Sequence, residues 1–156
     1  MQFLSPSCGP LDIDEVFQQI IAYMQEMPTE KYRLIIGTDS QTRDDTCFVT
    51  AILIHREGRG GRYFYTKERH DHIRSLRQRI FYETSRSLMV ASDFAERLAQ
   101  NGFGDLDIEI HLDVGPNGET KELIREVVGM VVGSGYHAKI KPESYGASNV
   151  ADKHTK

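Results

Sequence analysis

The chain has 156 residues, 39% of them hydrophobic and 27% charged, a composition typical of a globular protein with a substantial core. No apolar run approaches the roughly 20 residues of a membrane helix, and no signal peptide is evident, so we expect a cytoplasmic protein with no membrane partner. The net charge of −4 excludes a protein that grips nucleic acid through an overall cationic excess. Two cysteines, Cys8 and Cys47, are too few for a disulfide framework and agree with a reducing compartment.

The N-terminal part is predicted to contain an irregular segment followed by a helix. Residues 1–11 are rich in turn formers, so we expect no regular structure there. Residues 12–27 repeat apolar side chains at helical spacing, and Asp12 with Glu15 has the spacing of a capping box. Pro28 ends this helix, which we expect to pack against a sheet.

Three strands follow. Residues 32–38 are nearly all apolar, as in a central strand that is covered on both faces. Residues 47–55 and 62–66 have the composition of strands, and the glycine-rich segment 58–61 between them predicts a hairpin turn. We therefore expect the first three strands to be antiparallel neighbours.

A long helix is predicted over residues 70–100, which contain no Gly or Pro and repeat apolar residues at helical period. Asn101 and Gly102 stop it. At about 100° per residue, Glu83 falls at the flank of the apolar stripe rather than on the solvent face. A carboxylate in that position needs a partner.

The last part of the chain alternates strands and helices. Strands are expected at 107–113 and 136–141, with a helix over 120–132 between them that Thr120 caps. A helical crossover makes the two strands parallel. A short final helix is expected to hold Asp152.

The element order predicts an α/β fold in one domain spanning residues 1–156. The mixed five-stranded sheet has strands one to three antiparallel, strands four and five parallel to strand one, and flanking helices. A plain doubly wound fold is the alternative, against which the hairpin at 58–61 argues.

Four acidic residues fall where this fold can bring them together. Asp39 and Asp113 end the first and fourth strands, Glu83 lies on the long helix, and Asp152 lies on the last. Clustered carboxylates repel one another unless a cation is present, and Mg²⁺ or Mn²⁺ prefers oxygen ligands. The sequence therefore predicts a divalent-metal site, although Glu68, Asp71 and Asp93 are alternatives to Glu83.

Three segments carry a resemblance to a known family: GTDSQ at 37–41, HLDVGPNG at 111–118 and KPESYGASNVADKH at 141–154. They resemble the YkuK-like bacterial family, which is classed as ribonuclease H-like. The resemblance implies a ribonuclease H-like fold with an extra N-terminal helix. It also implies a site in which Asp39, Glu83, Asp113 and Asp152 act as metal-binding and catalytic residues.

The resemblance implies a Mg²⁺- or Mn²⁺-dependent nuclease that leaves a 3′-hydroxyl and a 5′-phosphate, with nucleic acid as its partner. The alternative is a non-catalytic module that binds nucleic acid or protein and retains the fold. Segment 113–120 also looks like the phosphate loop of actin-like ATPases, but those enzymes need two domains and this chain is long enough for one.

Other side chains near these acids have more than one interpretation. His154 can orient water or the scissile phosphate, or face solvent. Ser40 and Gln41 can bind a substrate phosphate or simply cap the strand end. Lys139 and Lys141 can contact a phosphate backbone or lie on a solvent-exposed strand face. His111 lies two residues before Asp113 on one predicted strand face, and can be a ligand, a partner of a ligand or a core histidine.

The start of the long helix is the most basic region of the chain. Its arginines can position a nucleic-acid strand, or form a solubilising face with i,i+4 pairs; they are Arg69, Arg74, Arg77, Arg79 and Arg86. The segment His70-Asp71-His72 can bind a transition metal, but the simpler interpretation is that these polar residues only mark the start of the helix.

Overall fold

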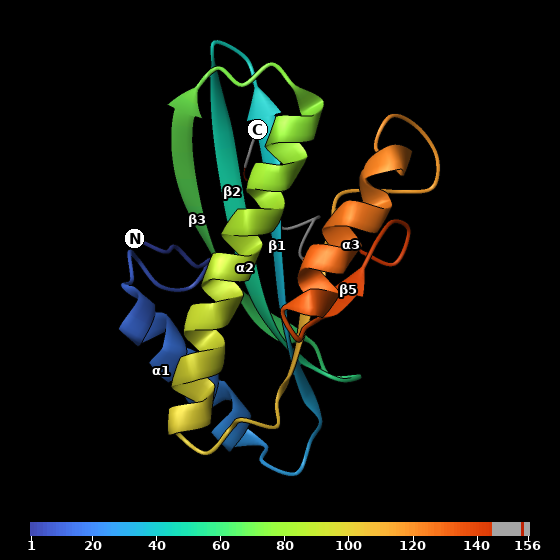
Figure 1. Ribbon diagram of the computed structural model, residues 1–156. Coiled ribbons are helices and arrows are strands. Elements are labelled where there is room, and N and C mark those ends of the chain that lie inside the picture. Colours follow the sequence, from blue (N-terminus) through green and yellow to red (C-terminus); the bar gives the residue numbers. More distant parts are fainter. Residues whose placement is uncertain (145–153, 155–156) are drawn as a thin grey trace.

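Five strands form one mixed sheet with helices packed on it in the computed structural model, which describes residues 1–144 and 154 (Figure 1). The strands are β1 (Tyr32–Thr42), β2 (Asp45–Arg56), β3 (Gly61–Asp71), β4 (Asp107–His111) and β5 (His137–Lys139). The helices are α1 (Ile13–Glu26), α2 (Leu76–Gln100), the 3₁₀ helix η1 (Lys121–Leu123) and α3 (Ile124–Gly133). The sheet order is β3-β2-β1-β4-β5. Antiparallel β1, β2 and β3, with β4 parallel to β1 and β5 parallel to β4, confirm the predicted mixed sheet.

The main apolar core lies between the sheet and the helices. Leu34 and Ile36 of β1 pack there with side chains of α1, α2 and α3, among them Phe94, which is fully buried. The alternate residues of β1 and β2 face the other way, where Ile35 and Ala51 belong to a smaller buried cluster. Strand β1 is therefore buried on both faces, as its apolar sequence predicts.

The N-terminal region agrees with the sequence and adds one anchor. Asp12 and Glu15 form the predicted capping box at the start of α1. The segment before it contains no helix or named strand, but Phe3 is fully buried and Leu4 bridges Tyr65 of β3. The irregular segment is thus attached to the sheet edge. Both cysteines are free thiols, as expected.

The meander of β1, β2 and β3 is longer than the sequence predicts. Strand β1 continues past Asp39 to Thr42, and β2 pairs with β3 without interruption from His55↔Gly61 to Asp45↔Asp71. The predicted hairpin turn is confirmed, with positive φ angles of 74° at Gly58 and 86° at Gly60. The predicted strand ends were too early because hydrogen bonding between neighbouring strands extends them through polar residues. The local strand propensity of such residues does not show whether a strand continues.

Helix α2 begins at Leu76, so the predicted start at His70 is wrong. Pairing with β2 holds His70 and Asp71 in β3, and Ser75 then caps the helix by accepting a hydrogen bond of 3.2 Å from the Gln78 backbone N–H. Ser75 and Gln78 have the sequence spacing of a capping box, a signal that could have located this end. At the other end Asn101 caps the helix and Gly102 has a φ of 83°, as predicted.

The C-terminal part differs at several boundaries. Strand β4 ends at His111 rather than at Asp113, and β5 is only His137–Lys139. Thr120 caps no helix; its hydroxyl instead accepts a hydrogen bond of 3.1 Å from the Gly115 backbone N–H and fastens the connection after β4. The predicted final helix with Asp152 falls outside the described residues. Within residues 1–144 and 154, no helix has the length and apolar character of a membrane span.

Candidate metal centre

The two predicted strand aspartates lie where β1 and β4 stop pairing. The parallel ladder between these strands runs from Arg33↔Asp107 to Gly37↔His111. Asp39 and Asp113 each come two residues after that last pair, Asp39 within β1 and Asp113 after the end of β4. The register therefore places both carboxylates at the same edge of the sheet.

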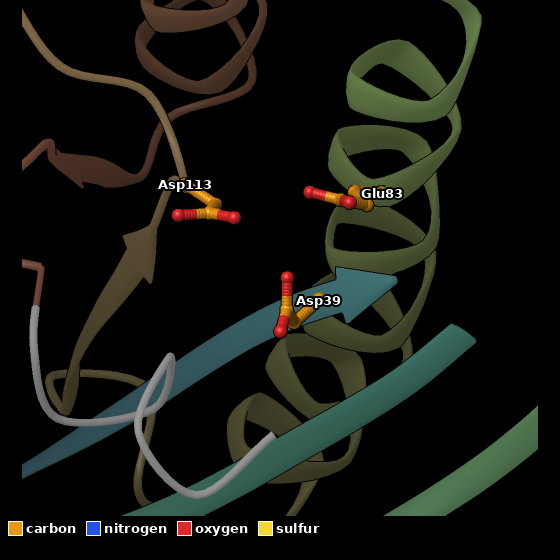
Figure 2. Close-up of side chains that lie close together, drawn as sticks. All are labelled: Asp39, Glu83 and Asp113. Carbon is orange, nitrogen blue, oxygen red and sulfur yellow. The ribbon is translucent and has the colours of Figure 1, made fainter. Parts of the chain in front are cut away.

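Helix α2 supplies the third carboxylate. Ligand oxygens of Asp39, Glu83 and Asp113 all lie within 4.8 Å of one another. Figure 2 shows the three side chains turned toward a common space from β1, α2 and the segment after β4. Of the helix acids considered from the sequence, Glu83 is the one that joins this acidic group, and it is only 6% exposed.

Glu83 is held in an environment that disfavours its charge. Burial raises the pKa of its carboxyl well above the ordinary value, and the charges of Asp39 and Asp113 raise this pKa further. The hydrogen bond from Ser40 acts in the opposite direction, as does the charge of Arg79. Burial and the two neighbouring carboxylates thus favour the neutral form of Glu83, and a divalent cation bound among the three would favour the ionised form. This all-oxygen donor set fits Mg²⁺ or Mn²⁺.

Hydroxyl groups fix α2 against β1 beside the acidic group. Ser40 is 8% exposed, and its hydroxyl donates to Glu83 Oε2 at 2.5 Å. One turn further along α2, Ser87 Oγ lies 2.8 Å from Thr38 Oγ1, which also lies 3.0 Å from Thr50 Oγ1. The sequence interpretation did not include these contacts. Their signal is polar residues at alternate positions of β1 and one turn apart on α2.

Lys141 is a basic residue that contacts the acidic group directly. Its ammonium lies 2.6 Å from Asp113 Oδ1, and this hydrogen bond raises the pKa of Lys141, with the more distant charges of Asp39 and Glu83 acting in the same direction. From the sequence, this lysine can contact a phosphate or lie on a solvated strand face. In the structure, its ammonium compensates one of the three carboxylates.

The other predicted substrate residues are distributed differently. Gln41 follows Asp39 on the same face of β1, and its Oε1 atom is buried without a hydrogen-bond partner among the described residues. Lys139 lines a separate cavity of about 230 Å³ together with His111 and Glu109. His154 stacks on the Tyr65 ring of β3, with ring centroids 3.7 Å apart, and is not a member of the acidic group.

His111 is a buried histidine that pairs with Glu109. Its Nε2 atom lies 2.9 Å from Glu109 Oε1, and Arg33 donates to the other oxygen of Glu109 at 3.1 Å. Burial lowers the pKa of His111, against the effect of Glu109. His111 is not a member of the acidic group, and its pairing with Glu109 favours the interpretation as a core histidine over that of a metal ligand.

The basic region at the start of α2 is largely paired between elements, so the predicted i,i+4 pairs do not account for it. Arg69 pairs with Asp45, and Arg77 with Glu126 of α3. Arg86 lies 3.1 Å from Glu68 of β3. His70 and His72 make separate contacts, with Tyr82 and with the Arg43 carbonyl, and the described residues hold no acid–histidine group there of the kind that binds a metal.

Comparison with known proteins adds two findings. A family model described as ribonuclease H-like matches residues 15–156. The "Uncharacterized protein YkuK" of Bacillus subtilis (strain 168) is 38% identical over 166 residues, covering 99% of this chain and 96% of the relative. No solved structure matches the chain.

Proposed function

The chain belongs to the ribonuclease H-like family, and we propose that it is a divalent-metal-dependent nuclease that hydrolyses phosphodiester bonds. The observation that carries this proposal is the meeting of three carboxylates from three elements, with ligand oxygens within 4.8 Å of one another. Asp39, Glu83 and Asp113 would hold Mg²⁺ or Mn²⁺. The bound cation would supply Lewis-acid stabilisation of the charge that develops on the phosphate.

Each side chain of the acidic group then has a task that its environment supports. A bound cation would offset the burial and repulsion that raise the pKa of Glu83, and the Ser40 hydroxyl holds the Glu83 carboxyl in place by a hydrogen bond. Asp152, proposed from the family resemblance, completes the ligands. A role for His154 in orienting the attacking water or the scissile phosphate rests on the same resemblance alone, since its ring stacks on Tyr65 of β3. Attack by water at phosphorus breaks the bond to the 3′ oxygen and leaves a 3′-hydroxyl and a 5′-phosphate.

Substrate contacts are proposed for the residues that border the acidic group. Lys141 carries a half-exposed ammonium at its edge, and Gln41 follows Asp39 on the same strand face. Lysine binds phosphate as a point charge, and the glutamine amide offers a donor to a phosphate oxygen. Lys139 lies with the His111 cavity and has no part in this proposal.

Nuclease activity is tested with purified protein and Mn²⁺ on single strands, duplexes, RNA/DNA hybrids and branched DNA. We expect cleavage of at least one substrate class, with a loss of at least about a hundredfold in Asp39→Asn. Asp105→Asn changes an exposed aspartate in the α2–β4 connection and should leave the rate unchanged. Absence of Asp39-dependent cleavage across all four substrates would refute the proposal.

A non-catalytic binding module is the second candidate, favoured by one observation. Lys141 already compensates Asp113, so the fold can tolerate part of this acid cluster without chemistry. Calorimetry separates the two candidates: Mn²⁺ binding that Asp39→Asn abolishes favours the nuclease. Nucleic-acid binding that is indifferent to both Mn²⁺ and Asp39 favours the module.

A further inference from the structure

Lys141 is held against the acidic group at three levels of its structure. Its backbone N–H donates to the Val114 carbonyl at 2.9 Å, which fixes its position beside the segment after β4. Its aliphatic stem lies against Gly115, where an added Cβ atom would be only 3.2 Å from Lys141 Cβ. Its ammonium ends 2.6 Å from Asp113 Oδ1. A lysine fixed at backbone, stem and head is more than a solvated surface charge.

Gly115 is part of this arrangement because of space rather than backbone conformation. It does not have a positive φ, but its missing side chain leaves room for the stem of Lys141. The hydroxyl of Thr120 accepts a hydrogen bond from the Gly115 N–H and holds the loop in place. The side chain of Lys141 therefore extends along the connection after β4 to Asp113.

The ammonium and a divalent cation compete for the same carboxylate. Asp113 is one of the three proposed metal ligands, and Lys141 contacts one of its oxygens directly. Two positive charges within a few ångströms repel each other, so a cation that takes Asp113 weakens the hold on the ammonium. The side chain of Lys141 is 57% exposed, and its head can therefore turn outward without unfolding any element.

We propose that Lys141 is a tethered counter-cation of the acidic group: it exchanges Asp113 for a phosphate of nucleic acid when a divalent cation binds. This inference rests on the proposed function for the cation and for the class of substrate. A released ammonium is a compact charge with three donors, well suited to a phosphate oxygen. The exchange makes the cation and the nucleic acid bind cooperatively. A cation that takes Asp113 frees the ammonium for a phosphate, and a phosphate that holds the ammonium leaves Asp113 open to the cation. Such coupling is reciprocal.

The test measures Mn²⁺ affinity by calorimetry for the wild-type protein and three variants. Lys141→Met removes the charge and keeps the stem, while Gly115→Ala keeps the charge but displaces the stem. Lys121→Met is the matched control, since Lys121 is exposed and forms no ion pair with any residue that the structure describes. Each titration is repeated with a short phosphorothioate single strand, which resists cleavage during the measurement.

We expect Lys141→Met to bind Mn²⁺ about threefold to fivefold more tightly than wild type without the oligonucleotide, as removal of a half-exposed competing charge predicts. Gly115→Ala should shift the affinity in the same direction by less, and Lys121→Met should not shift it. The oligonucleotide should tighten Mn²⁺ binding about fivefold in wild type and leave Lys141→Met unchanged. In EDTA, Lys141→Met should also melt at a lower temperature than Lys121→Met, because the repulsion among the carboxylates is no longer compensated.

Several outcomes would overturn this inference. Equal or weaker Mn²⁺ binding in Lys141→Met assigns the lysine a supporting role for Asp113 and removes the competition. An oligonucleotide effect of the same size in wild type and Lys141→Met removes the exchange onto phosphate. Either result leaves the metal site standing, whereas a wild-type protein that binds no Mn²⁺ overturns the proposed function together with the exchange.

Discussion

Replacing Ser40 by alanine removes one hydroxyl from the interface between β1 and α2, and tests whether Glu83 is held as tightly as its geometry indicates. Ser40 and Glu83 are 8% and 6% exposed, and the oxygens of their hydrogen bond are 2.5 Å apart. It is the only hydrogen bond of the Glu83 side chain with the described residues. After the replacement, the buried carboxyl no longer has a donor from Ser40.

The expected cost follows from what is left unpaired. Loss of a donor to a buried polar group costs about 1–3 kcal/mol, and more when that group is charged. Because the raised pKa of Glu83 favours its neutral form, we expect about 2 kcal/mol rather than a larger value. In a protein of this length, such a loss lowers the melting temperature by roughly 4–8 °C.

A double-mutant cycle isolates the contact. Urea unfolding in EDTA would compare wild type, Ser40→Ala, Glu83→Leu and the double variant, with Ser85→Ala as a control. Ser85 is exposed on α2, and its side chain forms no hydrogen bond within residues 1–144, so its replacement should change stability by less than about 0.5 kcal/mol. We expect Ser40→Ala to cost little in the Glu83→Leu background, with a coupling of about 1–2 kcal/mol.

One result would refute this reasoning. If Ser40→Ala changes the free energy of unfolding by no more than Ser85→Ala does, Glu83 has access to other donors. The acidic group would then be a solvated cluster rather than a preorganised set of ligands.

Three further predictions concern the acidic group and its support. The free energy of unfolding in EDTA should fall as pH rises from about 4.5 toward the raised pKa of Glu83, because over this range the folded state binds a proton that the unfolded chain has released. Urea unfolding at several pH values should show this decrease in wild type and a smaller one in Glu83→Gln. Mn²⁺ should raise the melting temperature, and Asp113→Asn should remove most of that rise. Thr38→Val should cost about 1–3 kcal/mol in urea unfolding, because the hydroxyls of Thr50 and Ser87 lose their buried partner.

Each of these predictions has an outcome that contradicts it. A pH slope that is the same in Glu83→Gln assigns the titration to another group. A full Mn²⁺ stabilisation in Asp113→Asn places the cation elsewhere. A Thr38→Val variant as stable as wild type shows that the hydroxyl network adds nothing to the attachment of α2.

Burial of the Glu83 carboxyl is expected to lower the stability of the fold while serving the proposed metal site. Glu83→Leu removes the cost of burying an ionisable group, so at neutral pH in EDTA this variant should be at least as stable as wild type. The same change removes one of three proposed ligands. If the proposed function is correct, Glu83 is retained in spite of its cost to stability because the cation needs it as a ligand.

Much of the fold was predictable because its signals are local. The capping box of Asp12 and Glu15, the positive-φ turn at Gly58 and Gly60, and the end of α2 at Asn101 are all encoded within a few residues. The carboxylates at positions 39 and 113 follow apolar runs whose strand character is visible in the sequence. From these signals the sheet order, and the approach of Asp39 to Asp113, could be inferred through the rules for connecting strands.

Tertiary structure alone decided how far each strand runs and which side chains meet. Pairing with β2 carries β3 through His70, which local periodicity assigned to a helix, and β4 ends at His111, two residues before Asp113. Glu83 meets Ser40, and Lys141 meets Asp113, across 43 and 28 positions of the sequence. Such contacts depend on register and on the rotation of a helix about its axis. Composition and period determine that a strand or helix forms, but only the packed sheet determines which of its atoms lie 2.5 Å apart.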